Sequence, residues 1–199
     1  MPSPNALITP EVLLAATLAR CEAMGVRIVQ KDGFWHQRWI DQALRVVTLG
    51  GMRSYMTEYV TTLGRGIFVP RDWAERSAGD RWEVLEHELV HVAQFERFGW
   101  VLMALIYLLL PFPMGLAYGR ARLEWEAYAV SLRCIAQREG IEAARSPAVA
   151  AHMVRRFAGP DYGFMWPFES SVRRWIADEL DAIERALTVQ FEVEREEQS

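Results

Sequence analysis

Asp80-Arg-Trp-Glu-Val-Leu-Glu-His87-Glu88-Leu-Val-His91 is the stretch that decides the fold, because it contains a histidine, a glutamate and a second histidine in the pattern H-E-x-x-H. Residues four apart lie on one face of an α-helix, so both imidazoles can reach one metal ion at about 2.0 to 2.1 Å. Glu88 projects about 100° around the helix from His87, beside the metal. Its carboxylate is then free to take a proton from a water that the metal activates.

Sequence signals indicate where the helix that contains this stretch begins and ends. Asp80 and Glu83 have the spacing of a capping box, which predicts that the helix begins near Arg81. Gly99 is expected to interrupt the helix after Phe98. The pattern thus predicts one helix that carries the histidine pair.

Short strands are expected before this helix. Val26 to Gln30 is the first, and the residues 55–62 and 66–69 form a hairpin around Leu63-Gly64-Arg65. Thr9-Pro10 is typical of the start of a helix, which we expect to reach Ala23. The residues 34–49 fit a helix or a strand equally well.

Helices dominate the second half of the chain. They are expected over 120–138, over 147–157 after Ser146-Pro147, and over the amphipathic, acidic C-terminal segment. The residues 159–168 form an aromatic loop. We therefore predict an α+β fold, mainly helical, in a single domain over residues 1–199, with a small sheet packed beside the H-E-x-x-H helix.

The composition excludes several classes of function. The net charge of −4 resides entirely in residues 171–199, so no basic face for nucleic acid is expected. Lys31 is the single lysine and leaves one weak candidate for an amine nucleophile. Cys21 and Cys134 are too few for a disulfide framework. No secretory signal is apparent at the start, so we expect a cytoplasmic protein.

A catalytic zinc ion takes three protein ligands, so the histidine pair needs a third. The other two histidines, His36 and His152, have no obvious ligand context. Downstream, Glu124 and Glu126 lie on a predicted helix. Because they are two residues apart, they project in different directions, and we expect only one of them to reach the metal.

This arrangement resembles the gluzincin clan of zinc metallopeptidases, to which thermolysin belongs. In that clan a glutamate some 30 residues after H-E-x-x-H, often within E-x-x-A-D, is the third ligand. Glu124-Trp-Glu126-Ala127-Tyr128 matches at the glutamate and the alanine, which implies Glu124 as the ligand and Glu126 as the runner-up. Tyr128 occupies the position of the family's aspartate. The resemblance covers residues 66–130 and implies a zincin-like fold.

Further residues are candidates for supporting roles around the metal. Gln94 follows His91 by three residues; we favour a helix-surface amide over a contact within the site. His152, Tyr128 and Tyr162 are the candidates for stabilising a developing oxyanion. For His152 a helix-surface position is the favoured interpretation.

An uncharged run of 22 residues, 98–119, lies between Arg97 and Arg120. Pro111 and Pro113 limit its continuous helix to about 16 Å, half of a bilayer core. A full crossing would also place Glu124 about 30 Å from His91. The run is therefore expected to double back, either as a core hairpin or as a shallow membrane insertion.

Taken together, these features predict a zinc-dependent hydrolase, most simply a metallopeptidase acting on a peptide or protein. His87, His91 and Glu124 would bind Zn²⁺, and Glu88 would act as the general base. The alternative is a non-catalytic metal-binding module that docks on a membrane or a protein partner through the residues 98–119. Peripheral membrane association is compatible with either function, and the oligomeric state stays open.

Overall fold

The computed structural model describes residues 9–31, 60–108, 117–159 and 164–197. Within these ranges the fold is mainly helical α+β, with six α-helices and a three-stranded mixed sheet, as predicted. The chain divides into two compact units, Met1–Tyr107 and Leu108–Ser199. The single domain over residues 1–199 stays a prediction.

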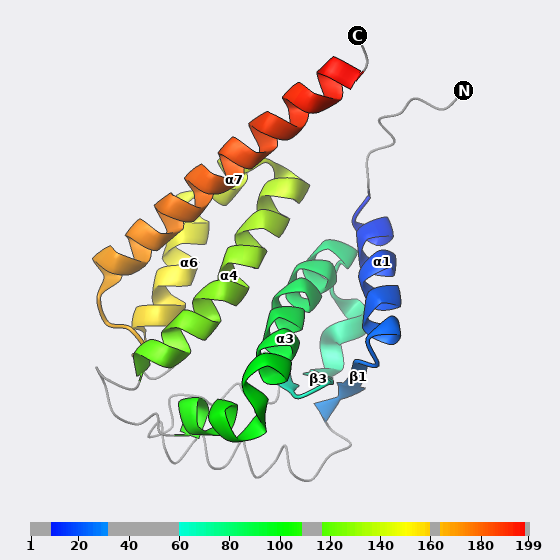
Figure 1. Cartoon of the computed structure of the whole chain (residues 1–199), viewed down its shortest axis with the longest axis vertical. Helices are drawn as coiled ribbons and strands as arrows, with labels where there is room; N and C mark the ends of the chain where they lie inside the picture. Colours follow the sequence, from blue (N-terminus) through cyan, green and yellow to red (C-terminus); the bar gives the residue numbers. More distant parts are fainter. Residues whose placement is uncertain (1–8, 32–59, 109–116, 160–163, 198–199) are drawn as a thin grey trace. The chain divides into compact units, whose positions relative to one another are not determined.

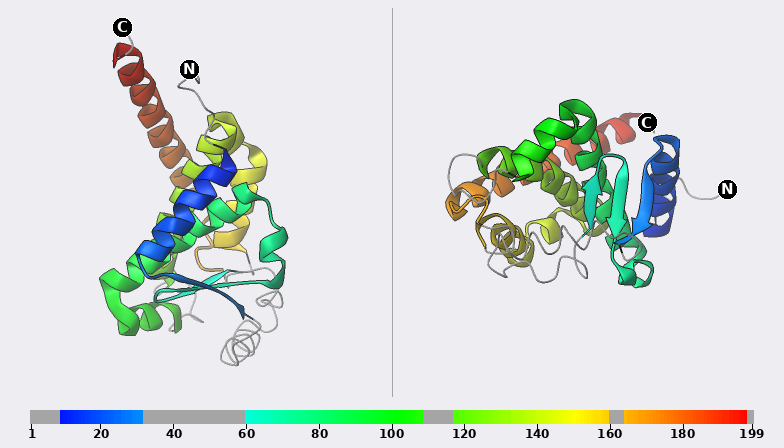
Figure 2. Two further views of the ribbon diagram at one scale, coloured as in Figure 1. Left: turned by 90° about the vertical axis from the view of Figure 1, so that its right-hand side faces the viewer. Right: turned by 90° about the horizontal axis from the view of Figure 1, so that it is seen from below.

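The sheet of the first unit has the strand order β1-β3-β2, and its three strands lie side by side in the right-hand view of Figure 2. The strands are β1 (Arg27–Gln30), β2 (Thr61–Leu63) and β3 (Gly66–Val69). β1 pairs with β3 in parallel, and β2 pairs with β3 antiparallel. Ile67 and Val69 of β3 are buried, which anchors the central strand in the core.

The turn between β2 and β3 confirms the predicted hairpin at Gly64 and Arg65. Gly64 has φ 59°, a left-handed conformation that glycine adopts without strain. A Cβ at this position would lie 2.7 Å from a ring carbon of Trp100. The close approach of the indole is therefore a second reason for glycine in this turn.

The first helix of this unit, α1 (Pro10–Ala23), has the predicted bounds. It is tied to the longer helix α3 (Ala78–Leu108), because the Thr17 hydroxyl donates a 2.6 Å hydrogen bond to Glu86. The chain between the sheet and α3 forms a short 3-10 helix, η2 (Arg71–Glu75), whose Trp73 is buried. The hydrogen bond from Thr17 therefore fixes α3 at Glu86, the residue that precedes His87.

The start of α3 differs from the prediction. Ser77, not Asp80, occupies the N-cap position: its hydroxyl accepts a 3.1 Å hydrogen bond from the backbone N–H of Asp80. The helix accordingly begins at Ala78, three residues earlier than expected. The reason is that serine and aspartate are both good N-cap residues, and sequence spacing alone favoured the later one.

The predicted interruption of α3 at Gly99 is confirmed, and Figure 1 shows the helix turning sharply near its end. Gly99 has φ 73° and ψ 166°, a backbone conformation that is almost exclusive to glycine. By length and composition alone, Ala78–Ile106 is the one helix in the described ranges that could cross a membrane. The non-helical glycine divides that helix into two shorter parts.

Helices of the second unit pack around one apolar core. They are α4 (Ala117–Glu139), α5 (Ile141–Ala144), α6 (Pro147–Ala158) and α7 (Glu169–Glu197), and α4, α6 and α7 lie side by side in Figure 1. Leu132, Phe157 and Val172 are fully buried among them. Ser146 accepts a hydrogen bond from the Val149 N–H, which confirms the predicted cap of α6.

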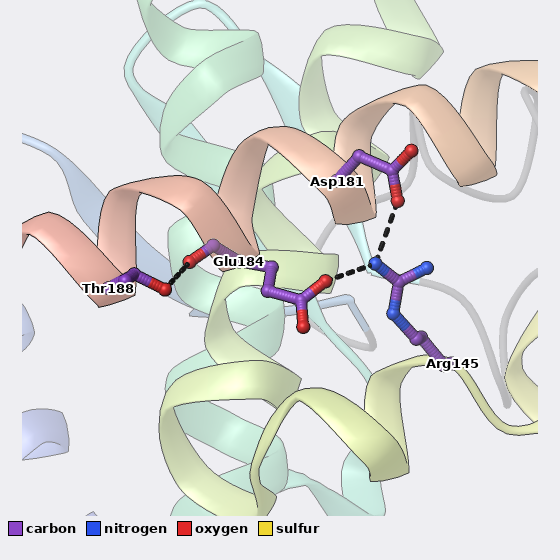
Figure 3. A network of polar contacts seen from close by, with 4 residues as sticks. All are labelled: Arg145, Asp181, Glu184 and Thr188. Atoms are coloured by element: carbon purple, nitrogen blue, oxygen red, sulfur yellow. Dashed lines mark hydrogen bonds and ion pairs between the residues drawn. The ribbon is translucent and has the colours of Figure 1, made fainter.

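Arg145 links the turn after α5 to α7 (Figure 3). Its guanidinium contacts Asp181 and Glu184 at 2.7 Å each. These two hydrogen-bonded carboxylates, Asp181 first, raise the pKa of Arg145 above its ordinary value. The arginine therefore stays charged, and the pairs are surface ties that contribute little to stability.

Candidate metal centre

The two histidines of the H-E-x-x-H pattern lie one turn apart on α3. The centroids of the His87 and His91 rings are 5.1 Å apart, and their planes meet at 72°. His91 is buried and His87 is half-buried. The helix therefore presents both imidazoles on one face, as the spacing predicts.

Glu124 joins this pair. One ligand atom from each of His87, His91 and Glu124 lies within 4.8 Å of the other two, and the Glu124 side chain is buried. Glu126, two residues further along α4, is exposed. His87, His91 and Glu124 form a candidate metal site. The resemblance favoured Glu124 over Glu126, and Glu124 is the acid found in this group.

Gln94 is part of the surroundings of His91. Its side chain is only 3% exposed, and its Oε1 lies 2.9 Å from Nδ1 of His91. The amide oxygen can only accept, so this contact places the proton on Nδ1 and leaves Nε2 as the basic nitrogen. The favoured interpretation of Gln94 as a helix-surface amide is wrong, because Gln94 lies on the buried face of α3.

Glu88 is buried as well, and a hydroxyl lies next to its carboxylate. Thr62 of β2 donates a hydrogen bond of 2.6 Å to Glu88 Oε2. The side chains are 8% and 7% exposed. A hydrogen bond to a carboxylate is about twice as strong as one between neutral groups. It gives the buried carboxylate of Glu88 a partner, and without a partner its burial would destabilise the fold.

Two of the other predicted residues belong to helices α4 and α6 of the second unit. Tyr128 is buried in the core of the second unit, where its ring lies 5.4 Å from that of Phe157. His152 is exposed on α6, the position we favoured for it. Tyr162 and His36 lie outside the described residues.

Two residues bear on other chemistries. Burial raises the pKa of the Cys21 thiol, with Arg20 lowering it and Glu86 raising it to smaller extents. A nucleophilic cysteine requires a lowered pKa, so Cys21 is a structural residue of α1. Lys31, the single lysine, is buried and only 1% exposed.

Thr62 is the contact that the sequence could not indicate. It precedes Glu88 by 26 residues, and it is the buried member of a strand whose other two residues, Thr61 and Leu63, are half-buried. No periodicity connects a strand residue to a helix residue at that distance. The hairpin signal located the strand, but its contact with α3 depends on tertiary packing.

No protein-family model, curated protein or solved structure matches the chain. The functional argument therefore rests on the residues of the site.

Proposed function

We propose that the protein is a zinc-dependent hydrolase whose substrate is a peptide or a protein. The observation that carries the proposal is the gathering of ligand atoms from His87, His91 and Glu124 within 4.8 Å of one another. Two histidines and one glutamate are a ligand set of catalytic zinc sites, which leave a fourth position for water or substrate.

The donor set fits this metal. The ligand atoms of a tetrahedral zinc ion lie about 3.3 Å apart at bond lengths of about 2.0 Å, so small side-chain rotations suffice. Imidazole and carboxylate are ligands that zinc accepts readily. The contact between Gln94 and His91 supports the same assignment, because ligand histidines usually donate their other N–H to an oxygen acceptor.

In the proposed mechanism Glu88 handles the protons. Bound Zn²⁺ supplies a Lewis acid that lowers the pKa of water at the site to about 7. Glu88 accepts the proton of the attacking water and later donates a proton to the leaving amine. Gln94 keeps His91 in the tautomer whose Nε2 lone pair is available.

Metal analysis of single variants tests the ligand set. We expect one zinc per chain in the purified protein, and loss of that zinc in His87→Ala and in Glu124→Ala. Glu126→Ala is the matched control, because it removes an exposed carboxylate of the same helix. If Glu126→Ala alone empties the site, the assignment of the third ligand is wrong.

Glu88→Gln tests catalysis separately from binding. We expect it to retain zinc and to lower hydrolysis of a quenched fluorescent peptide library by about 100- to 10,000-fold, the usual contribution of a general base. Unchanged hydrolysis in Glu88→Gln would contradict the proposal. Retained zinc with no hydrolysis in the unmodified protein would favour a non-catalytic module.

A specific observation favours that module as the second candidate, in which the site is structural and the protein docks on a membrane. After Gly99, α3 exposes four large apolar side chains. They are Trp100, Val101, Leu102 and Leu105. The chain carries no charged residue in this part of the helix. An exposed apolar cluster of this kind is typical of a contact surface, and an indole prefers the interface of a bilayer.

Vesicle sedimentation tests the docking. We expect the protein to sediment with neutral phosphatidylcholine vesicles, and the double variant Trp100→Ser/Val101→Ser to stay in solution. Val12→Ser/Leu18→Ser is the control, because it removes exposed apolar side chains from α1 instead. Equal sedimentation of both double variants would contradict a role for this part of α3.

A further inference from the structure

The hydroxyl of Thr62 is the contact of the candidate site that the proposed function leaves without a role. We propose that Thr62 is a positioning residue, which holds the carboxylate of Glu88 in the orientation that proton transfer requires. The inference rests on the proposed function, because it assigns Glu88 the role of general base. It adds strand β2 to the residues on which catalysis depends.

The geometry of the contact fits this role. The Thr62 hydroxyl lies 2.6 Å from Glu88 Oε2, and 3.5 Å from the backbone oxygen of the same residue. The carboxylate oxygen is therefore the acceptor that the hydroxyl favours. The hydroxyl fixes one carboxylate oxygen of Glu88, and in the proposed mechanism the other, Oε1, faces the proton that the base takes.

Thr62 is itself firmly held. It pairs with Ile67 of β3, whose side chain is fully buried, so the core fixes the position of the strand. Threonine is branched at Cβ, and its χ1 angle has few alternatives. Glu88, by contrast, has a long side chain with three rotatable bonds. The stiffer partner therefore determines where the carboxylate of the more flexible one lies.

Positioning of this kind affects turnover more than binding. A base must lie within hydrogen-bond distance of the proton it takes, and a displacement of about 1 Å can lower the rate by about 100-fold. We expect Thr62→Val to lower kcat by about 10- to 100-fold while KM and the zinc content stay unchanged. Thr62→Ser retains a hydroxyl and should recover most of the rate.

A double-mutant cycle separates positioning from a general structural effect. In the Glu88→Gln background, Thr62→Val should cause little further loss of kcat, because the base is already missing. Thr61→Val is the matched control, since it removes the neighbouring hydroxyl of the same strand and should leave kcat unchanged. Equal fold losses from Thr62→Val with and without Glu88 would overturn the proposal.

The metal-free protein offers a readout that does not involve turnover. The urea midpoint of unfolding should fall in Thr62→Val, and should fall much less when Glu88 is replaced by leucine, because the hydroxyl then has no carboxylate to contact. The same fall in both backgrounds would show that the hydroxyl does not act through Glu88. If Thr62→Val does not fold, Thr62→Ala removes the same hydroxyl and carries the same expectations.

The two proposals fail in different ways. If Glu88→Gln retains full activity, the hydrolase proposal fails regardless of Thr62. If Glu88→Gln is inactive while Thr62→Val has an unchanged kcat, the role of Thr62 fails and the hydrolase proposal stands. If Thr62→Ser is as impaired as Thr62→Val, the hydroxyl is not the group that matters.

Discussion

The two parts of α3, before and after Gly99, invert the usual relation between polarity and burial. Before Gly99 the polar side chains of Glu88 and Gln94 are only 7% and 3% exposed. After Gly99 the apolar side chains of Trp100 and Val101 are 59% and 76% exposed. One helix therefore buries two of its polar residues before Gly99 and exposes two of its apolar residues after it.

The difference teaches that hydropathy alone does not decide burial at every position of this helix, although Leu85 and Val92 follow it. A buried polar group must have hydrogen-bond partners, and Thr62 and His91 supply them to Glu88 and Gln94. An exposed apolar side chain needs no hydrogen-bond partner. A cluster of such side chains is typical of a surface that contacts a partner or a membrane. The first part of α3 is thus suited to a site, and the second part to a contact surface.

The largest effect is expected from breaking the first part at its metal ligand. His91→Ala removes one ligand atom of the three, so zinc and hydrolysis should both be lost. The loss should exceed the about 10- to 100-fold typical of residues that only support a ligand. Elemental analysis and a peptide assay measure it, with the exposed His152→Ala as control. Full zinc content in His91→Ala would show that the buried face of α3 serves packing alone.

A second test compares buried and exposed residues within the other part of α3. Met103 is 1% exposed, so Met103→Ala should destabilise the fold by about 2 to 5 kcal/mol through the cavity it leaves. Val101→Ala, two residues away, should stay within about 0.5 kcal/mol. Urea unfolding measures both variants. Equal destabilisation by the two would mean that the exposed face is covered in solution.

Gln94 allows the comparison to be sharpened at the boundary of the site. Gln94→Leu keeps the volume but removes the acceptor for the Nδ1–H of His91, so zinc affinity should fall by about 10- to 100-fold. Gln94→Glu restores an acceptor and should bind zinc at least as tightly as Gln94→Leu does. Competition with a chromophoric chelator measures the affinities. Unchanged affinity in Gln94→Leu would return Gln94 to a packing role.

The smallest effect is expected at the junction itself. Gly99→Ala places a side chain on a backbone with φ 73° and ψ 166°, which costs about 1 to 3 kcal/mol. Nothing lies within 4 Å of the added Cβ, so the effect comes from backbone strain alone. Thermal unfolding measures it. An unchanged or higher Tm would indicate that α3 continues straight through residue 99 in solution.

Local signals predicted most of the fold. Proline and serine at helix starts placed α1 and α6, and Gly99 placed the break in α3. The starts of α3 and α4 each lie three residues earlier than expected. In α3 the reason is that Ser77 and Asp80 compete as N-caps, and the choice depends on where the chain enters the helix. The mainly helical α+β class followed from the same signals.

The sequence by itself determined that His87 and His91 share one face of a helix, because the period of the α-helix fixes residues four apart. Resemblance favoured Glu124, but spacing alone left Glu126 open. Only the tertiary structure decided that a ligand atom of Glu124 lies within 4.8 Å of those of the histidines, and that Thr62 contacts Glu88. The physical reason is range: helical periodicity acts over a few residues, whereas the contact between Thr62 and Glu88 joins positions 26 apart and exists only once the core has packed.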